Sequence, residues 1–538
     1  MRRSDAAIAQ RTANLVDDEK KAEERPDRQR RQHVEGAVIR KASATEPAGV
    51  GNVLDERVGG SGAYHRDGEA ERELVQATSQ GGRLFRPHGP ALPALRRLVW
   101  AHAESRRDMT ALARGMTIGA LAGGASSAVR AGAAVGGEPF VQAYGRGAYA
   151  YDASGRGYVD YLMAYGPLLF GHAHPALVCG LDALAARGSV FGSTSEDELR
   201  LAERIALLLP SMERMRFVNT GTEAMMSAVR VARAFTGRSL IARFSGNYHG
   251  HFDDALHSAG ASAQTRDAAR SGIPAEVRAQ SVVAQYNDLA DLDARLAGRE
   301  PELAAIVVEP VVGNMGLVVP ETGFLEGLFA RARRAGALII FDEVITWLRL
   351  GTPGAQGRFA LGPDLSAIGK AMGGGFPLAA FGGRSDVMAV LSPAGEAFTG
   401  GTFSGNPFSI ALGHRVLDLI ESDASLYANL EGKAAHLADG MRAVFAARAL
   451  PYAVAQLASM VDFAFRPGPL ARNYDERRAA DAAAFAAYYH GMRERGILLA
   501  PSPNELMFLS TEHGAAEIER TLEAFDATLA ELQRKGTI

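Results

Sequence analysis

Two residues in the middle of the chain, Asp342 and Lys370, have types and positions that suit covalent chemistry on an amine. Asp342 follows the apolar run 338–341, and Lys370 ends the stretch 364–370. Short apolar runs bounded by Gly and Pro are typical of buried strands in a parallel sheet, and functional residues collect at the carboxyl ends of such strands. An acid and a lysine at one rim suggest a Schiff-base lysine beside a carboxylate that keeps a pyridinium nitrogen protonated.

Each of these two residues also has an ordinary structural explanation. An Asp at a strand end is commonly a helix cap or a turn former, because its short side chain bonds to nearby backbone groups. An isolated Lys is commonly a solvated surface charge. The assignment therefore depends on whether further motifs fall at the same edge of the predicted sheet.

A second motif lies where a strand is followed by a helix. The run 216–218 leads into Thr220, Gly221 and Thr222, and a helical pattern then continues to about residue 235. Hydroxyls and free backbone N–H groups at a helix N-terminus form an anion site, which the helix dipole strengthens. A simple capping box explains the same residues, and the spacing is not that of a Walker loop.

Further strand ends follow along the chain. Residues 244–251 offer the aromatic ring of Tyr248, and the predicted strand 305–308 runs into Glu309. Strands that alternate with helices over this span predict a doubly wound α/β domain with a mostly parallel sheet. Function would then collect along one edge of that sheet.

Composition separates an N-terminal extension from a globular remainder. Residues 1–108 carry dense charge and little apolar periodicity, which predicts a disordered tail or an over-extended reading frame whose true start lies near Met109 or Met116. A basic interaction arm is the alternative. We expect deletion of residues 1–108 to leave the activity intact.

The remainder divides into three predicted parts. Residues 109–170 form the N-terminal part of a small domain and a substrate loop, with a hairpin over 149–161. Residues 171–421 form the large domain, in which a helix is expected at about 176–186. Residues 422–538 form a small α+β domain that ends in a helix at about 515–534.

The overall composition excludes several classes of function. The chain has 538 residues, a formal net charge of −3 and one cysteine, Cys179. This charge gives no case for nucleic acid or an anionic membrane as a partner, and a single cysteine excludes an intramolecular disulfide framework. His172 and His174 lack a third ligand at metal spacing, so no metal site is expected. No run is long enough to cross a bilayer and no secretory signal is present, so we expect a cytoplasmic protein.

The motifs together resemble the class III aminotransferases, which are pyridoxal-phosphate enzymes of fold type I. The resemblance covers the chain from about residue 111 to its end. It is carried by residues 219–224, 248–250, 309–310, 342–344, 369–370 and 401–407.

The resemblance implies a role for each matching residue. Lys370 would bind pyridoxal 5'-phosphate covalently and move the proton between carbons, with pyridoxamine 5'-phosphate formed in turn. Asp342 would bind the pyridine nitrogen, and Tyr248 would stack on the ring. Glu309 would lie close to the cofactor.

The same resemblance implies that residues of two subunits would hold each cofactor phosphate. Thr220, Gly221 and Thr222 would hold it at the helix N-terminus. Thr402 would reach the phosphate of the neighbouring subunit, which implies a homodimer with shared active sites.

Within this family the chain is most similar to the glutamate-1-semialdehyde 2,1-aminomutase subgroup, which converts its substrate to 5-aminolevulinate. In that subgroup Ser127 and Arg130 would bind the substrate carboxylate, since a guanidinium fork matches a carboxylate. Glu505 would lie near the substrate amine, and Tyr165 stands where the subgroup has Trp. Residues 259–274 correspond to a mobile gating loop and match it poorly.

Three alternatives remain open. The enzyme could be an intermolecular transaminase that acts on another amino acid or amine in secondary metabolism. It could be an idle pyridoxal-phosphate fold used for sensing or assembly, although the intact pair of Asp342 and Lys370 argues against this. A decarboxylase of related fold would show His before the lysine, where this chain has Gly369.

Overall fold

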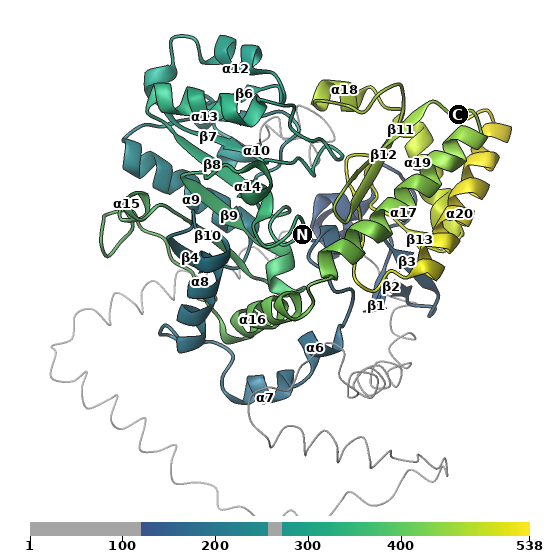
Figure 1. Cartoon of the computed structure of the whole chain (residues 1–538), viewed down its shortest axis with the longest axis horizontal. Helices are drawn as coiled ribbons and strands as arrows, with labels where there is room; N and C mark the ends of the chain where they lie inside the picture. The colour runs from purple at the N-terminus through teal and green to yellow at the C-terminus, as the bar shows by residue number, and fades with distance from the viewer. Residues whose placement is uncertain (1–119, 257–271) are drawn as a thin grey trace, which may run out of the picture. The chain divides into compact units, whose positions relative to one another are not determined.

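The computed structural model describes residues 120–256 and 272–538, all of which belong to one compact unit of the chain (Figure 1). The predicted N-terminal extension 1–108 and its two alternative start sites lie outside the described residues. The same holds for most of the predicted gating segment 259–274.

A seven-stranded sheet forms the centre of the larger part of the molecule. Its strand order is β4-β10-β9-β8-β7-β5-β6, and only β10 runs antiparallel to its neighbours. The bounds are β4 Arg214–Val218, β5 Leu240–Phe244, β6 Ser281–Ala284, β7 Leu303–Val308, β8 Leu338–Glu343, β9 Leu365–Ile368 and β10 Ala379–Gly383. This confirms the predicted doubly wound fold with a mostly parallel sheet.

Helices cover both faces of this sheet, as the continuous burial of its central strands requires. Ile340 of β8 packs in one apolar cluster with α9 (Gly221–Thr236), whereas its neighbour Phe341 packs in another with α13 (Phe324–Ala335). Successive side chains of a strand point to opposite faces, so the alternation places the two helices on opposite sides (Figure 1).

The remaining elements of the larger part are mostly helices. The expected single helix at 176–186 is wrong, because the chain breaks at Gly180, whose φ is 70°. Their bounds are α6 Pro175–Val178, α7 Leu181–Ala186, α8 Glu196–Leu208, α10 Asp253–Leu256, α11 Ala275–Arg278, α12 Leu289–Leu296, α14 Gly354–Phe359, α15 Ser385–Met388 and α16 Pro407–Ser422.

Two smaller sheets and three long helices form the other part. The first sheet contains β1 Gln142–Arg146, β2 Tyr149–Asp152, β3 Gly157–Asp160 and β13 Ile497–Leu498, and the second contains β11 Tyr452–Leu457, β12 Met460–Pro467 and β14 Met507–Phe508. The helices are α17 Leu426–Ala447, α19 Ala482–Glu494 and α20 Ala515–Arg534, with the short α18 Tyr474–Arg478 beside them. The predicted hairpin and the predicted last helix are both confirmed.

Parallel pairing of β13 with β3 joins the early segment to the C-terminal one. Val159 and Phe525, which lie far apart in sequence, consequently share one apolar core. This contact agrees with the prediction that residues 109–170 and 422–538 build one small domain, whose limits remain a prediction.

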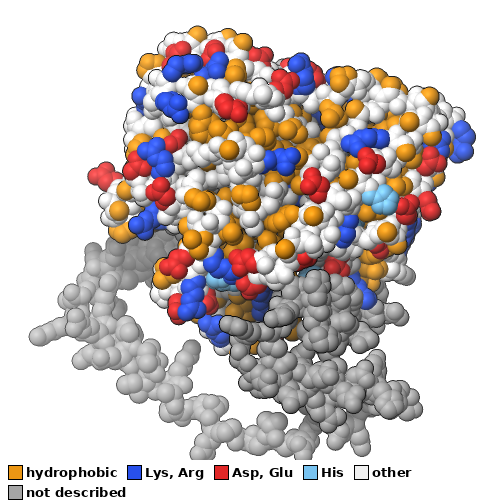
Figure 2. Space-filling model, in the orientation of Figure 1, with side chains coloured by type: hydrophobic (Ala, Val, Ile, Leu, Met, Phe, Trp, Pro, Cys, Tyr) orange, Lys and Arg blue, Asp and Glu red, His pale blue; other side chains and the backbone are white. Residues whose placement is uncertain are grey.

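The surface of the described part has no concentrated charge on the face drawn in Figure 2, where acidic and basic side chains are interspersed around a hydrophobic middle. Within the two described ranges, no helix is both long and apolar enough to cross a bilayer. His172, which sequence alone left without a role, bonds through Nε2 to Asp160 Oδ2 at 2.7 Å.

Candidate active site

A cavity of about 460 Å³ opens at the carboxyl edge of the large sheet. Strand ends supply much of its wall, because β4, β5, β7, β8 and β9 run parallel and finish at the same edge. The predicted site residues that line it are Arg130, Thr220, Gly221, Thr222, Tyr248, Glu309, Asp342 and Lys370.

Asp342 is held in one orientation by two hydrogen bonds. Its Oδ2 lies 2.8 Å from His249 Nδ1, and its Oδ1 accepts the N–H of Val344 at 3.1 Å. The side chains of Asp342 and His249 are only 5% and 2% exposed. The next residue, Glu343, is buried and accepts the N–H of Ala355, so the two acids of this strand end serve different purposes.

Lys370 lies just beyond β9 and opens a short 3₁₀ turn, Lys370–Gly373. Its φ of 48° is a strained value for a residue with a side chain, and such strain persists where the surroundings fix the conformation. Burial lowers the pKa of its ammonium group, which favours the neutral amine. The other described lysines, Lys433 and Lys535, bond instead to the Thr511 carbonyl and to Glu531.

The first turn of α9 can hold an anion. Thr220 caps the helix in a capping box with Glu223, in which Thr220 Oγ1 accepts the Glu223 N–H at 3.1 Å. The structural interpretation of this motif is therefore correct, yet it leaves the N–H groups of Gly221 and Thr222 for another partner. A Cβ on Gly221 would lie 2.9 Å from Val344 Cγ1, so a larger residue here would displace the Val344 side chain.

Glu309 ties the strand ends to one another. Its Oε1 accepts the N–H of Tyr248 at 2.7 Å, and its Oε2 accepts Gly313 N–H and Asn314 Nδ2, each at 2.9 Å. Burial, together with the nearby charge of Asp342, raises the pKa of Glu309 to about 7. Glu309 thus fixes the backbone that carries the Tyr248 ring.

Glu505 approaches the same lysine from the small domain. Burial raises its pKa to about 7, while the charge of Lys370 acts in the opposite direction. Two ionisable carboxyl groups, Glu505 and Glu309, therefore influence Lys370 near neutral pH. Such coupled groups are typical of sites that move protons.

Arg130 lines the cavity directly, whereas Tyr165 is adjacent to a lining residue. Arg130 belongs to the 3₁₀ turn Ala128–Ala131 and lines the cavity, and in the described part of the chain no carboxylate forms an ion pair with it. Tyr165 follows Ala164, which lines the cavity, and its buried hydroxyl has no hydrogen-bond partner among the described residues.

Four predicted residues are not among those that line this cavity, namely Ser127, Tyr165, Thr402 and Glu505. Ser127 is exposed and only its carbonyl is used, as the acceptor for the Arg130 N–H at 3.0 Å. Thr402 is also exposed, in a loop between the exposed rings of Phe398 and Phe403. Their predicted roles toward the substrate and a neighbouring subunit remain predictions.

Sequence reasoning missed His249 and Asn247. His249 follows Tyr248 directly, but nothing in the local pattern shows that it meets Asp342, 93 residues later. Asn247 Oδ1 accepts the Glu309 N–H at 3.0 Å in a similar long-range contact. The one available signal was that two polar residues, Asn247 and His249, follow shortly after the fully buried strand β5.

The residues present fit pyridoxal phosphate. The Lys370 amine, the buried Asp342 carboxylate and the Tyr248 ring face one cavity with the helix N-terminus at Gly221. These groups match a carbonyl, a ring nitrogen, an aromatic face and a phosphate, respectively.

Comparisons with known proteins point to one family. The sequence profile of the family described as Aminotransferase class-III matches residues 133–512. A glutamate-1-semialdehyde 2,1-aminomutase of Desulfitobacterium hafniense (strain DSM 10664 / DCB-2) is 42% identical over 421 residues, covering 78% of this chain and 97% of that protein.

Solved structures give the same family. An omega-transaminase from Sphaerobacter thermophilus has a TM-score of 0.70 and 32% identity, covering 84% of this chain and 100% of that one. A variant glutamate-1-semialdehyde-aminomutase from Pseudomonas aeruginosa PAO1, in complex with PMP, has a TM-score of 0.69 and 26% identity, covering 82% and 99%.

Proposed function

Because the chain belongs to the class-III aminotransferases, which transfer amino groups with pyridoxal phosphate, we propose that it is a glutamate-1-semialdehyde 2,1-aminomutase. In this reaction an amino group leaves one carbon of the substrate and enters the neighbouring carbon, which gives 5-aminolevulinate. The 42% identity to a protein of that name, over 97% of its length, supports the choice of substrate.

The observation that carries the proposal is that Arg130 and Lys370 line the same cavity. Arg130 lines the cavity without an ion-pair partner among the described residues, so its guanidinium is available for the carboxylate at one end of a substrate. Lys370 then faces the end that carries the amine and the carbonyl. Glutamate-1-semialdehyde has charged and reactive groups at these two ends.

The chain's own residues would divide the chemistry among them. When bound, the cofactor supplies an electron sink for the carbon that loses a proton. Lys370, whose pKa burial lowers, would take that proton and deliver it to a second carbon. Asp342, oriented by His249, would keep a ring nitrogen protonated, and Glu505 would exchange protons with Lys370 near pH 7.

A second candidate function is intermolecular transamination. The omega-transaminase that covers 84% of this chain favours it, as does Tyr165 in place of the Trp of the aminomutase subgroup. In that case the first product leaves, and a separate keto acid or aldehyde takes the amino group. The two reactions differ in whether a second substrate is required.

The proposal includes a cytoplasmic homodimer with shared active sites. Phe398 and Phe403, on either side of Thr402, are 73% and 59% exposed. Two exposed rings on one loop favour burial against another surface. If a second copy of the chain bound this loop, Thr402 of the first copy would lie near the phosphate site of the second.

A single-substrate assay tests the proposal. Enzyme loaded with pyridoxamine phosphate receives glutamate-1-semialdehyde and no other amine, and 5-aminolevulinate is measured over many turnovers. We expect sustained product formation. One equivalent of product or less would instead support the intermolecular transaminase.

A further inference from the structure

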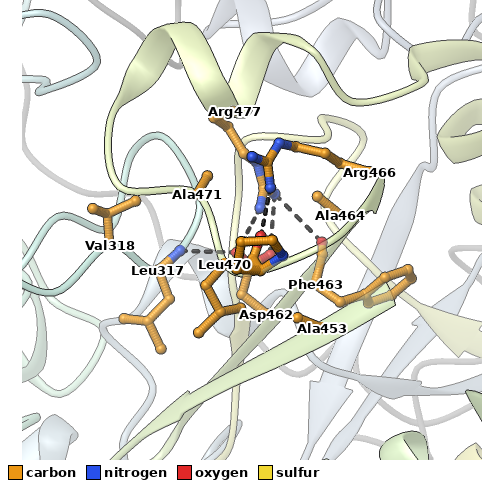
Figure 3. A pocket seen from close by; sticks show the side chains of 11 residues that line it. Leu317, Val318, Ala453, Asp462, Phe463, Ala464, Arg466, Leu470, Ala471 and Arg477 are labelled. Carbon is orange, nitrogen blue, oxygen red and sulfur yellow. Dashed lines mark hydrogen bonds and ion pairs between the residues drawn. The ribbon is translucent and has the colours of Figure 1, made fainter. Parts of the chain in front are cut away.

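A buried ion pair joins α18 to β12. Arg477 of α18 donates from Nη1 to Asp462 Oδ2 at 2.7 Å and from Nη2 to Asp462 Oδ1 at 3.1 Å (Figure 3). The two side chains are only 5% and 7% exposed. A buried ion pair contributes little stability by itself, because desolvation opposes the attraction, so its other contacts indicate what it does.

Those other contacts reach two separate loops. Asp462 Oδ2 accepts the N–H of Leu317 at 2.9 Å, and Arg477 Nη2 donates to the carbonyl of Pro503. The loops are also joined directly, since the N–H of Gly316 donates to the carbonyl of Asn504 at 2.8 Å. The pair and the two loops therefore form one hydrogen-bonded network.

The first loop, residues 312–318, supports Glu309. A bridge between Val312 and Val318 closes it, and within it Gly313 and Asn314 both donate to Glu309 Oε2. In the same loop, a Cβ on Gly316 would lie 2.5 Å from Arg477 Cζ and from Asp462 Oδ2. The ion pair is thus packed directly against this loop.

The second loop, residues 501–506, carries Glu505. The N–H of Glu505 donates to the Ser502 carbonyl at 3.3 Å, which makes a turn around Pro503 and Asn504. These two residues give their carbonyls to Arg477 and Gly316. The backbone next to Glu505 is therefore held by Arg477 and by Gly316.

We propose that Asp462 and Arg477 are a positioning pair, which holds both loops in place. The pair thereby positions Glu505, and also Asn314, whose bond to Glu309 holds that carboxyl group near Lys370. This inference rests on the roles proposed above for Glu309 and Glu505. Neither Asp462 nor Arg477 lines the cavity, so both act through the loops.

The pair has a consequence for the pH dependence of the reaction. The pKa of Glu505 is raised to about 7 chiefly because the carboxyl group is buried. A loosened loop lets water reach this group, and its pKa falls toward the ordinary value for Glu. The part of the rate profile that Glu505 controls then moves to lower pH.

The test uses the holoenzyme with the double substitution Asp462→Leu and Arg477→Met. This variant leaves no unpaired buried charge, so the fold is kept while the bonds to Leu317 and Pro503 are lost. Arg466→Met is the matched control, because Arg466 lines the same small hollow but bonds to Pro469 and Glu476 (Figure 3).

Two readouts are compared, one of which needs no substrate. Hydrogen exchange of peptides that cover 312–318 and 501–506 should become faster in the double variant. Its kcat should fall roughly ten- to a hundredfold, because a small misplacement of catalytic groups has this effect, and its rate profile should move to lower pH by about one unit. The control should match the wild type in both readouts.

The results separate failure of this inference from failure of the proposed substrate. Wild-type exchange in both loops, or faster exchange with an unchanged pH profile, would overturn the positioning role. If glutamate-1-semialdehyde is not the substrate, the profile is measured with the amino donor that is active. If the double variant does not fold, Arg477→Lys is used, which keeps the positive charge but loses the two parallel hydrogen bonds of the guanidinium. An unchanged dependence of the rate on pH in that variant would also overturn the proposal.

Discussion

Replacing His249 with Leu should weaken cofactor binding without unfolding the protein. The His249 Nδ1 atom lies 2.8 Å from Asp342 Oδ2, and both side chains are almost completely buried. The substitution leaves one oxygen of a buried carboxylate without its partner. Since a hydrogen bond to a charged group contributes about 1.5–3 kcal/mol, cofactor affinity should fall about 10- to 150-fold.

The assay is a titration of apoenzyme with pyridoxal phosphate, followed by visible absorbance. His249→Asn, whose amide can still donate to Asp342, should recover part of the affinity. His436→Leu is the control, because it removes another histidine–carboxylate pair, His436 with Glu519, that is half-exposed and does not line the cavity. Affinity within twofold of the wild type in His249→Leu would refute the proposed role of this pair.

Three further predictions concern Lys370, Arg130 and Glu505. Lys370→Ala should abolish both the visible absorbance of the loaded enzyme and its turnover, and full colour with full activity would contradict the assignment. Arg130→Ala should raise KM about 10- to 100-fold for acidic substrates but little for uncharged amines, since it removes only a charge-assisted bond; equal effects would exclude Arg130 from the carboxylate site. Because burial raises the pKa of Glu505 to about 7, this group loses its proton as pH rises through 7. Glu505→Gln should therefore flatten the dependence of kcat on pH in that range. An unaltered dependence would show that ionisation of Glu505 does not control the rate.

The sequence predicted the large sheet and the set of residues around its edge, for a physical reason. Parallel strands finish at one edge, so Glu309 after β7, Asp342 in β8 and Lys370 after β9 had to lie near one another once those strands were recognised. Strong periodicity gave α20 its observed bounds, Ala515–Arg534.

Contacts between distant segments could not be predicted in this way. The bond between His249 and Asp342 depends on how two loops pack, and the pair of Asp462 and Arg477 depends on how α18 sits against β12. The break at Gly180 was missed because the apolar pattern on both sides of it continues in helical register. Local patterns indicate elements, whereas these features come from tertiary packing.

The most direct test of the account is to find the lysine that holds the cofactor. Loaded enzyme is reduced with borohydride, which makes the linkage permanent, and its peptides are then analysed by mass spectrometry. We expect the cofactor to be attached to Lys370. Attachment to Lys433 or Lys535, or no attachment at all, would contradict the claim that the cavity at the end of β9 is the active site.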